Sequence, residues 1–399
     1  MTASRTADGR PAGMFSLPDN HPDAAFATYA RLRDAHPAAY TEDLGGYWAL
    51  TGYEDVRAAA SDAATFISSV KAVVPSDPRG IRRPPLNFDA PRHTPFRRAL
   101  TRTLAPGRVA ALSERISERA VSLFEEFVDG EDDELTRSFG TLLPAYAEAM
   151  WLNLDPDRVT WLAETATAWV EAWRRQDGEA VSLHSERMYE VARWLVADRR
   201  ENPRDPKEDP ASSLLSERVD GQGLDEEHMV GALRQSLVVG MVAPPLLIGG
   251  IARHLALDPQ LHQNLRTGAV PMDAALEEFL RLYTPYRGFA RTVSATTEVA
   301  GERLEPGEPV TLVYAAANRD PAQFPDPDRF DASRPNLDRH LGFGRGQHQC
   351  VGQHLARGII RAALDVMVHR AERLELLGEP EPTRMPELGY QSVRIRVHR

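Results

Sequence analysis

The chain has 399 residues, of which 42% are hydrophobic and 26% are charged, an ordinary balance for a globular protein. Its formal net charge of −11 argues against general nucleic-acid binding, and we expect no membrane-spanning segment because no apolar run is long enough. One cysteine excludes an internal disulfide and fits a reducing compartment, so we expect a cytoplasmic protein.

The N-terminal part predicts an alternation of helices and short strands. Residues 1–20 look loosely attached, and the apolar spacing from Ala24 to His36 is helical. Two short strands are expected over Ala38–Tyr40 and Tyr47–Leu50, and helical spacing returns over Tyr53–Ala60.

A pair of cationic residues follows further along the chain. His93 and Arg97 are four residues apart, so they share one face if this segment is a helix. Two such groups together suit a carboxylate. The spacing is common on solvated helices, and by itself it is a weak signal.

The most apolar stretch is Ser236–Gly250, which is apolar on all sides and is therefore predicted to be a buried helix. Asp225, earlier in the chain, is suited to cap a helix that begins at Glu226 and Glu227. Pro244 and Pro245 lie inside the stretch, where a proline removes a backbone N–H and costs about 3 kcal/mol or more. Two interpretations stay open: a distortion that serves chemistry, and a local kink without chemical meaning.

A possible ion pair lies in the second half of the chain, on a predicted helix. Glu278 and Arg281 are three residues apart and can pair on one face. By itself this spacing is not specific.

The single cysteine lies in the most specific pattern of the chain. A thiolate that ligates a metal must be kept from protonation, and glycines let a loop curl tightly enough to aim N–H groups at the sulfur. The residues after it are predicted to begin a helix, whose dipole favours the anion. A lone cysteine is more often a small buried hydrophobe, but here six positions of ten residues follow F-G-x-G-x-H-x-C-x-G: Phe343, Gly344, Gly346, His348, Cys350 and Gly352.

This loop closely resembles the haem-binding loop of the cytochromes P-450, the haem-thiolate monooxygenases, and the resemblance covers essentially the whole chain. It implies a mainly α fold with small β sheets, the triangular prism of that family, as a single haem domain over residues 1–399. It also implies haem b with Cys350 as the axial iron ligand. The further haem contacts that it implies are Phe343, Gly344 and Gly352 in the loop and His93, Arg97, Arg291 and His348 at the propionates.

The resemblance also assigns structural and substrate-binding roles. Glu278 and Arg281 become a structural pair that bonds into the segment before the cysteine loop, completed by Arg329 or Arg334, between which the sequence does not choose. Tyr286 and Phe289 either face the substrate or are packed strand residues, and both interpretations stay open.

The distal helix departs from the family pattern A-G-x-(D/E)-T. Val242 stands in the place of the acid and Ala243 in that of the threonine, and neither side chain donates a proton. Together with Pro244 they would form an atypical oxygen groove, and Val239, Val242 and Ala243 would line an apolar substrate pocket. Three hypotheses for the two protons that O2 activation needs are a polar group of the substrate, water held by carbonyls that the prolines leave unpaired, and peroxide as the oxidant.

We therefore expect a soluble, bacterial-type monooxygenase that inserts one oxygen atom from O2 into a small organic substrate, by hydroxylation or O-dealkylation. A peroxide-driven peroxygenase is the alternative, and a haem-binding sensor without turnover is a more distant one. A monomer is expected, with electrons from a ferredoxin or a flavin or iron–sulfur reductase on a basic face. The arginines expected there, some of which would instead bind propionates or acidic neighbours, are Arg97, Arg98, Arg102, Arg345, Arg357 and Arg361.

Overall fold

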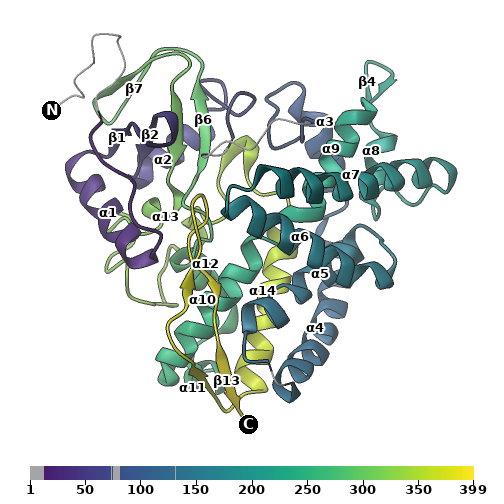
Figure 1. Ribbon diagram of the computed structural model, residues 1–399. Helices are drawn as coiled ribbons and strands as arrows, with labels where there is room; N and C mark the ends of the chain where they lie inside the picture. The colour runs from purple at the N-terminus through teal and green to yellow at the C-terminus, as the bar shows by residue number, and fades with distance from the viewer. Residues whose placement is uncertain (1–12, 73, 75–80, 131) are drawn as a thin grey trace. The chain divides into compact units, whose positions relative to one another are not determined.

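The computed structural model describes residues 13–72, 74, 81–130 and 132–399. The chain divides into two compact units, and taken as a whole it is mainly helical with small sheets, as predicted (Figure 1). The single haem domain expected over residues 1–399 stays a prediction. The first unit contains Met1–Asp77, Glu277–Cys350 and Pro382–Gly389, and the second contains Pro78–Leu276, Val351–Glu381 and Tyr390–Arg399.

A five-stranded sheet in the order β1-β2-β9-β6-β3 forms the framework of the first unit. β2 and β9 are parallel, and the other neighbouring strands are antiparallel. In the parallel pair Trp48 lies opposite Val310 and Leu50 opposite Leu312, and all four side chains are buried in one core cluster. The strands are β1 (Ala38–Thr41), β2 (Tyr47–Leu50), β3 (Phe66–Ile67), β6 (Phe289–Val293) and β9 (Pro309–Leu312).

Helices and a hairpin complete this unit. The two strands and two helices predicted between Ala24 and Ala60 are confirmed to within two residues at each end. The elements are α1 (Pro22–Ala35), η1 (Asp43–Gly45), α2 (Tyr53–Ser61), the end of α12 (Met272–Leu282), β7 (Thr297–Val299), β8 (Glu302–Leu304), α13 (Tyr314–Ala317), η4 (Leu337–Arg339) and η5 (Gly346–His348).

The loose attachment expected for residues 1–20 is wrong for residues 13–20, and residues 1–12 lie outside the described residues. The N–H of Met14 donates to the carbonyl of Tyr40 at 2.7 Å. Met14 and Leu17 also pack against the buried core, so burial of apolar side chains holds this segment although no periodic pattern predicted it.

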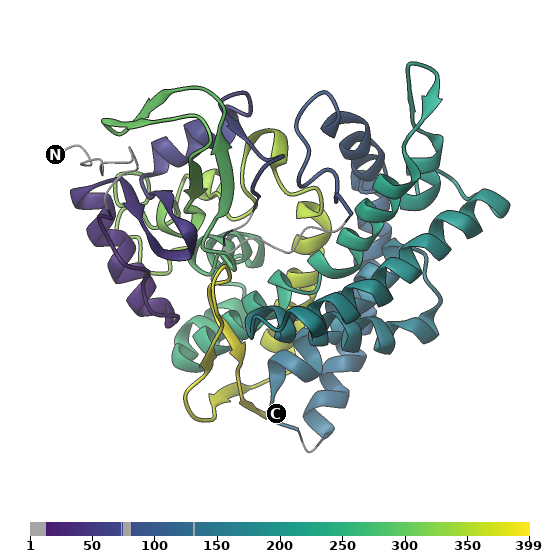
Figure 2. The ribbon, with the colours of Figure 1, turned by 45° about the horizontal axis from the view of Figure 1, so that its top comes forward.

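In the second unit α14 packs against α4, α5 and α10, and α4 packs against α5. α7 packs against both α6 and α9 (Figure 2). A two-stranded antiparallel sheet of β10 and β13 lies near the C-terminus. The helices are α3 (His93–Arg102), α4 (Pro106–Asp129), η2 (Thr136–Gly140), α5 (Leu142–Trp151), η3 (Pro156–Arg158), α6 (Val159–Arg174), α7 (Gly178–Glu201), α8 (Pro210–Ser216), α9 (Glu226–Val239), α10 (Ala243–Leu257), α11 (Pro259–Arg266) and α14 (Gln353–His369). The strands are β4 (Arg218–Val219), β5 (Gln222–Gly223), β10 (Arg373–Leu376), β11 (Glu381–Pro382), β12 (Tyr390–Ser392) and β13 (Ile395–His398).

The long apolar stretch forms two helices. α9 is capped by Asp225, whose side chain accepts from the N–H of His228 at 2.9 Å, and it ends before a turn over residues 240–242. Pro244 and Pro245 lie in the first turn of α10. N–H groups in a first turn have no helical partner, so the cost that we expected for prolines inside a helix does not arise there.

The stretch Glu226–Leu257 is also the part of the described chain that is long and apolar enough to cross a membrane by composition. In the structure, 78% of its most apolar window is buried against the rest of the protein. Such burial is typical of a core helix.

Candidate functional site

Tight turns shape the loop that carries Cys350. Gly344 has φ +65° and Gly346 has φ +73°, both in the left-handed region that favours glycine. A Cβ at Gly346 would lie 2.2 Å from the carbonyl oxygen of Ala60, so this glycine also allows the loop to approach α2. The N–H of Cys350 donates to the carbonyl of Phe343 at 2.8 Å. The partly buried sulfur is therefore held on a rigid backbone, as a metal ligand requires.

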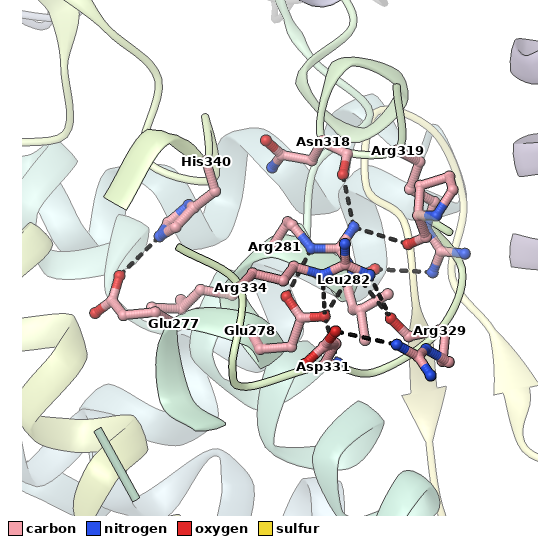
Figure 3. A network of polar contacts seen from close by, with 12 residues as sticks. Glu277, Glu278, Arg281, Leu282, Asn318, Arg319, Arg329, Asp331, Arg334 and His340 are labelled. Carbon is pink, nitrogen blue, oxygen red and sulfur yellow. Dashed lines mark hydrogen bonds and ion pairs between the residues drawn. The ribbon is translucent and has the colours of Figure 1, made fainter. Parts of the chain in front are cut away.

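Glu278 and Arg281 form a fully buried ion pair in the first unit (Figure 3). Arg281 donates twice, from Nε to Oε2 of Glu278 at 2.7 Å and from Nη2 to Oε1 at 2.8 Å. Nε of Arg334 donates to the same Oε1 atom at 3.1 Å. The side chain of Arg329 is mostly exposed and pairs with Asp331. Arg334 therefore completes the network that the sequence left open between two arginines.

Asn318 connects this network to the cysteine loop, and the sequence interpretation gave it no role. Its carbonyl accepts from Nη1 of Arg281 at 2.8 Å, and its Oδ1 accepts from the N–H of Leu341 at 2.6 Å. Nδ2 of Asn318 donates to Oγ1 of Thr284 at 2.7 Å. The buried ion pair thus positions the first residues of the loop through one amide side chain.

His340 provides a second anchor at the start of the loop (Figure 3). The N–H of Gly342 donates to Nδ1 of His340 at 3.1 Å, so Nδ1 is the unprotonated ring nitrogen. The other nitrogen, Nε2, then carries the hydrogen and donates to Oε2 of Glu277 at 2.8 Å. These two bonds define the tautomer and orientation of the ring.

Arg291 on β6 is a buried cation that exposes 4% of its surface. Its Nη1 donates to the carbonyl of Ala290 at 2.8 Å, and the guanidinium also bonds to the hydroxyl of Tyr314. No carboxylate pairs with it among the described residues. Because an unpaired buried guanidinium is costly, the position fits a ligand carboxylate such as a haem propionate.

His93 and Arg97 lie one turn apart on α3 in the second unit, as predicted. Burial, and then the positive charge of Arg97, lowers the pKa of His93 to about 4. The ring is therefore neutral at pH 7, and a neutral imidazole keeps one N–H to offer to a carboxylate. The N–H of His93 and the guanidinium of Arg97 therefore suit a carboxylate, such as the second haem propionate that the resemblance implies.

The distal residues differ in their exposure. Val239 exposes 43% of its surface, whereas Val242 exposes 6%. Of the two, Val239 therefore has surface available to a ligand. The residues of this turn are apolar, and Val242 and Ala243 offer no proton donor.

Tyr286 and Phe289 pack on each other in the first unit, with ring centroids 5.1 Å apart. Phe289 also lies against Tyr314, at 6.5 Å between centroids. Both rings are partly buried, so packing within the strand region is established, and contact with a substrate stays a prediction.

The arginines expected on a basic face have several acidic neighbours. Arg98 and Arg102 both bind the buried carboxylate of Glu217. Burial pushes the pKa of Glu217 up, but the hydrogen bonds from the two arginines outweigh it and hold that pKa below its usual value. Arg361 pairs with Asp273. Their charges are therefore partly neutralised within the protein.

Arg345 differs from this group. It is exposed on the cysteine loop, and it forms no ion pair with the carboxylates of the described segments. Its charge is therefore available to a negatively charged partner without competition from the carboxylates of those segments.

Glu148, on α5, was missed by the sequence interpretation. It is buried, and its carboxyl lies against Gly240 at the end of α9. The only sequence signal was one acidic residue within the apolar run from Leu142 to Trp151.

Comparisons with known proteins point to one family. A family model described as cytochrome P-450 matches residues 263–396. Mycinamicin IV hydroxylase/epoxidase from Micromonospora griseorubida is 31% identical over 88% of this chain and 89% of its own, and linalool 8-monooxygenase from Pseudomonas putida is 29% identical over 87% and 89%. The structure of a Mycobacterium marinum cytochrome P-450, CYP268A2, in complex with pseudoionone superposes with a TM-score of 0.87 at 25% identity, covering 98% of this chain and 100% of that one.

Proposed function

Because the chain belongs to the cytochrome P-450 family, we propose that it inserts one atom of O2 into a small organic substrate, by hydroxylation or O-dealkylation. The observation that carries the proposal is the Cys350 loop, in which two glycines with positive φ and one backbone bond hold the sulfur for iron ligation. When bound, a haem with a thiolate ligand supplies the redox chemistry that cleaves O2.

The residues of this chain that would hold haem b are divided by role. Cys350 would be the axial ligand, and Phe343, Gly344 and Gly352 would shape its loop. Arg291, with its buried and unpaired charge, would bind one propionate together with His348. His93 and Arg97 would offer an N–H and a guanidinium to the other.

A neutral and largely apolar natural product is the substrate class that we propose. Two relatives are named for linalool and mycinamicin IV. Val239, with its exposed apolar surface, suits such a molecule better than a charged one. Displacement of water by substrates of this class should shift the spin state of the iron, so a panel of terpenoids, macrolides and fatty acids would define the class by optical titration.

Two measurements test the proposed reaction. The reduced protein with CO should show the red-shifted Soret band of thiolate ligation, and a histidine-type band would refute the assignment of Cys350. Product should then form with a ferredoxin, a reductase and NAD(P)H. A thiolate band without product from any member of the panel would favour a haem-binding sensor.

A peroxygenase is the second candidate, and a specific observation favours it. Val242 and Ala243 replace the acid and the alcohol that organise proton delivery in the family. Peroxide carries both oxygen atoms and both protons, so this reaction consumes no protons from solvent. If peroxide is the natural oxidant, turnover with it should equal or exceed turnover with reductase, and a large shortfall would reject this candidate.

We expect an electron-transfer partner, a ferredoxin or a flavin or iron–sulfur reductase, to bind near Arg345. Arg345→Glu should lower the rate of reductant-driven turnover by up to about tenfold at low salt, the lower end of what charge steering contributes to association. Turnover driven by peroxide should stay unchanged, and the difference from the wild type should shrink as salt screens the charge.

The matched control for this prediction is Lys207→Glu, which makes the same change in net charge outside the arginine set. Arg102 is unsuitable because its replacement would also remove a bond to the buried Glu217. An equal loss of reductant-driven and peroxide-driven turnover in Arg345→Glu would refute the docking role.

The proposed function also includes a monomeric state and a location in the cytoplasm.

A further inference from the structure

Glu148 is a buried carboxyl group without a charged partner. It exposes 5% of its surface, and its neighbours on α5, Ala145, Ala147 and Ala149, are buried and apolar. Its Oε2 atom has no hydrogen-bond partner in the part of the chain that the structure describes. Burial of an unsatisfied polar group is costly, so its presence calls for a functional explanation.

The carboxyl group lies directly against the backbone of Gly240. A Cβ at this position would lie 1.7 Å from Oε1 and 2.4 Å from Cδ of Glu148. Any other residue at 240 would therefore displace the carboxyl. Gly240 begins the turn between α9 and α10, so the acid lies at the break in the distal stretch.

This break provides hydrogen-bond acceptors beside the acid. In an α-helix the carbonyl of one residue accepts from the N–H four residues later. For Gly240 and Met241 those later residues are Pro244 and Pro245, which have no N–H. Two such carbonyl groups and a carboxyl match the number of polar partners that an internal water molecule needs.

Burial raises the pKa of Glu148 to about 8, and burial is the only cause. The group therefore holds a proton at neutral pH. Four arginines of α4, η2, α9 and α10 have other partners. Arg119 binds Tyr146 and Glu126, Arg137 binds Glu171, Arg234 binds Ser185 and stacks on Trp169, and Arg253 stacks on Tyr390.

We propose that Glu148 supplies the protons that O2 activation consumes, from α5, in place of the distal-helix acid that Val242 replaces. The inference rests on the proposed monooxygenase function. One turnover combines substrate, O2, two electrons from the partner protein and two protons, and it yields the oxygenated substrate and water. Each proton passes from the carboxyl of Glu148 to water at the break, and the carboxylate regains a proton from solvent. Because Glu148 acts through water and does not touch the reacting oxygen atoms, it is a positioning residue and not a catalytic one.

Infrared spectroscopy of the purified holoprotein tests whether the carboxyl of Glu148 carries a proton, and it requires no turnover. The wild type should show a carboxylic-acid C=O stretch that shifts in D2O and disappears as the pH rises through about 8. Glu148→Gln should lack the band. The control Glu171→Gln, at a glutamate that pairs with Arg137 on the surface, should keep it. A wild type without the band at pH 7 would overturn the proposal.

The amount of product formed per electron delivered tests whether Glu148 delivers the protons. In Glu148→Gln the rate of product formation per electron delivered should fall by roughly 100-fold, the lower end of what a general acid contributes, and hydrogen peroxide should accumulate. Glu148→Asp should restore part of the coupling. Wild-type coupling should fall as the pH rises through about 8, whereas coupling in the glutamine variant should not depend on pH.

Peroxide-driven turnover separates a proton role from a merely structural one. Because peroxide brings its own protons, Glu148→Gln should keep the wild-type rate with peroxide. Equal loss in both reactions, or unchanged coupling in the variant, would overturn the proposal. A wild type that shows the infrared band but forms no product would refute the monooxygenase function, and the role of Glu148 with it.

Discussion

Cys350→Ser should lower reductant-driven oxygenation by more than roughly 100-fold, because loss of even an outer partner of a metal ligand costs about 10- to 100-fold. A serine hydroxyl is not an anion at neutral pH, so it cannot donate electron density to iron as a thiolate does. The reduced CO complex of the variant should lose the red-shifted Soret band. Product formation with a ferredoxin and reductase should fall in parallel.

The fold should survive this change. The N–H of Cys350 donates to the carbonyl of Phe343 at 2.8 Å, and this bond does not involve the side chain. The far-ultraviolet circular dichroism and the thermal midpoint of the variant should therefore stay close to those of the wild type. Cys350→His is the matched variant, since it should retain haem and show a histidine-type band. An unchanged thiolate-type band in Cys350→Ser would contradict the assignment.

Glu278→Ala should destabilise the protein by about 3 to 5 kcal/mol, the cost of breaking a buried ion pair by removing one partner. Glu278 exposes no surface and accepts from Arg281, from Arg334 and from the N–H of Asp331 at 2.8 Å. The alanine variant would leave two guanidinium groups buried without an anion. Since native proteins are stable by only about 5 to 15 kcal/mol, urea unfolding should show a large shift.

Haem retention should fall together with stability in Glu278→Ala. Arg281 positions the carbonyl of Asn318, whose side chain holds the N–H of Leu341 at the start of the cysteine loop. The control Arg329→Ala removes only an exposed pair with Asp331, so it should cost no more than about 1 kcal/mol. If both variants lost the same stability, the buried pair would not be the structural centre that its contacts indicate.

Several features of this protein follow from the sequence because their signals are local. The cysteine loop occupies ten consecutive residues, and Gly344 and Gly346 in it have the positive φ values that tight turns require. Asp225 caps α9, and the strands expected over Ala38–Tyr40 and Tyr47–Leu50 appear to within one residue. A cap or a turn depends on neighbours along the chain, so the sequence is sufficient for it.

Tertiary structure alone decided which residues meet across long separations. Arg334, and not Arg329, reaches Glu278 because the path of the intervening loop determines which side chain points inward. Arg102 is bound to Glu217, although its charge had suggested a docking role. Neither outcome has a periodic signal, since each depends on contacts between distant segments.

The distal stretch shows most clearly which features the sequence determines and which only the tertiary structure decides. Its sequence predicted a buried apolar helix with a distortion at Pro244 and Pro245, and it showed that Val242 and Ala243 cannot donate protons. Only the fold placed those prolines in a first helical turn and brought the carboxyl of Glu148 against Gly240. The packing of α5 against its neighbours creates that contact, and no local pattern encodes a meeting of residues so far apart in the chain.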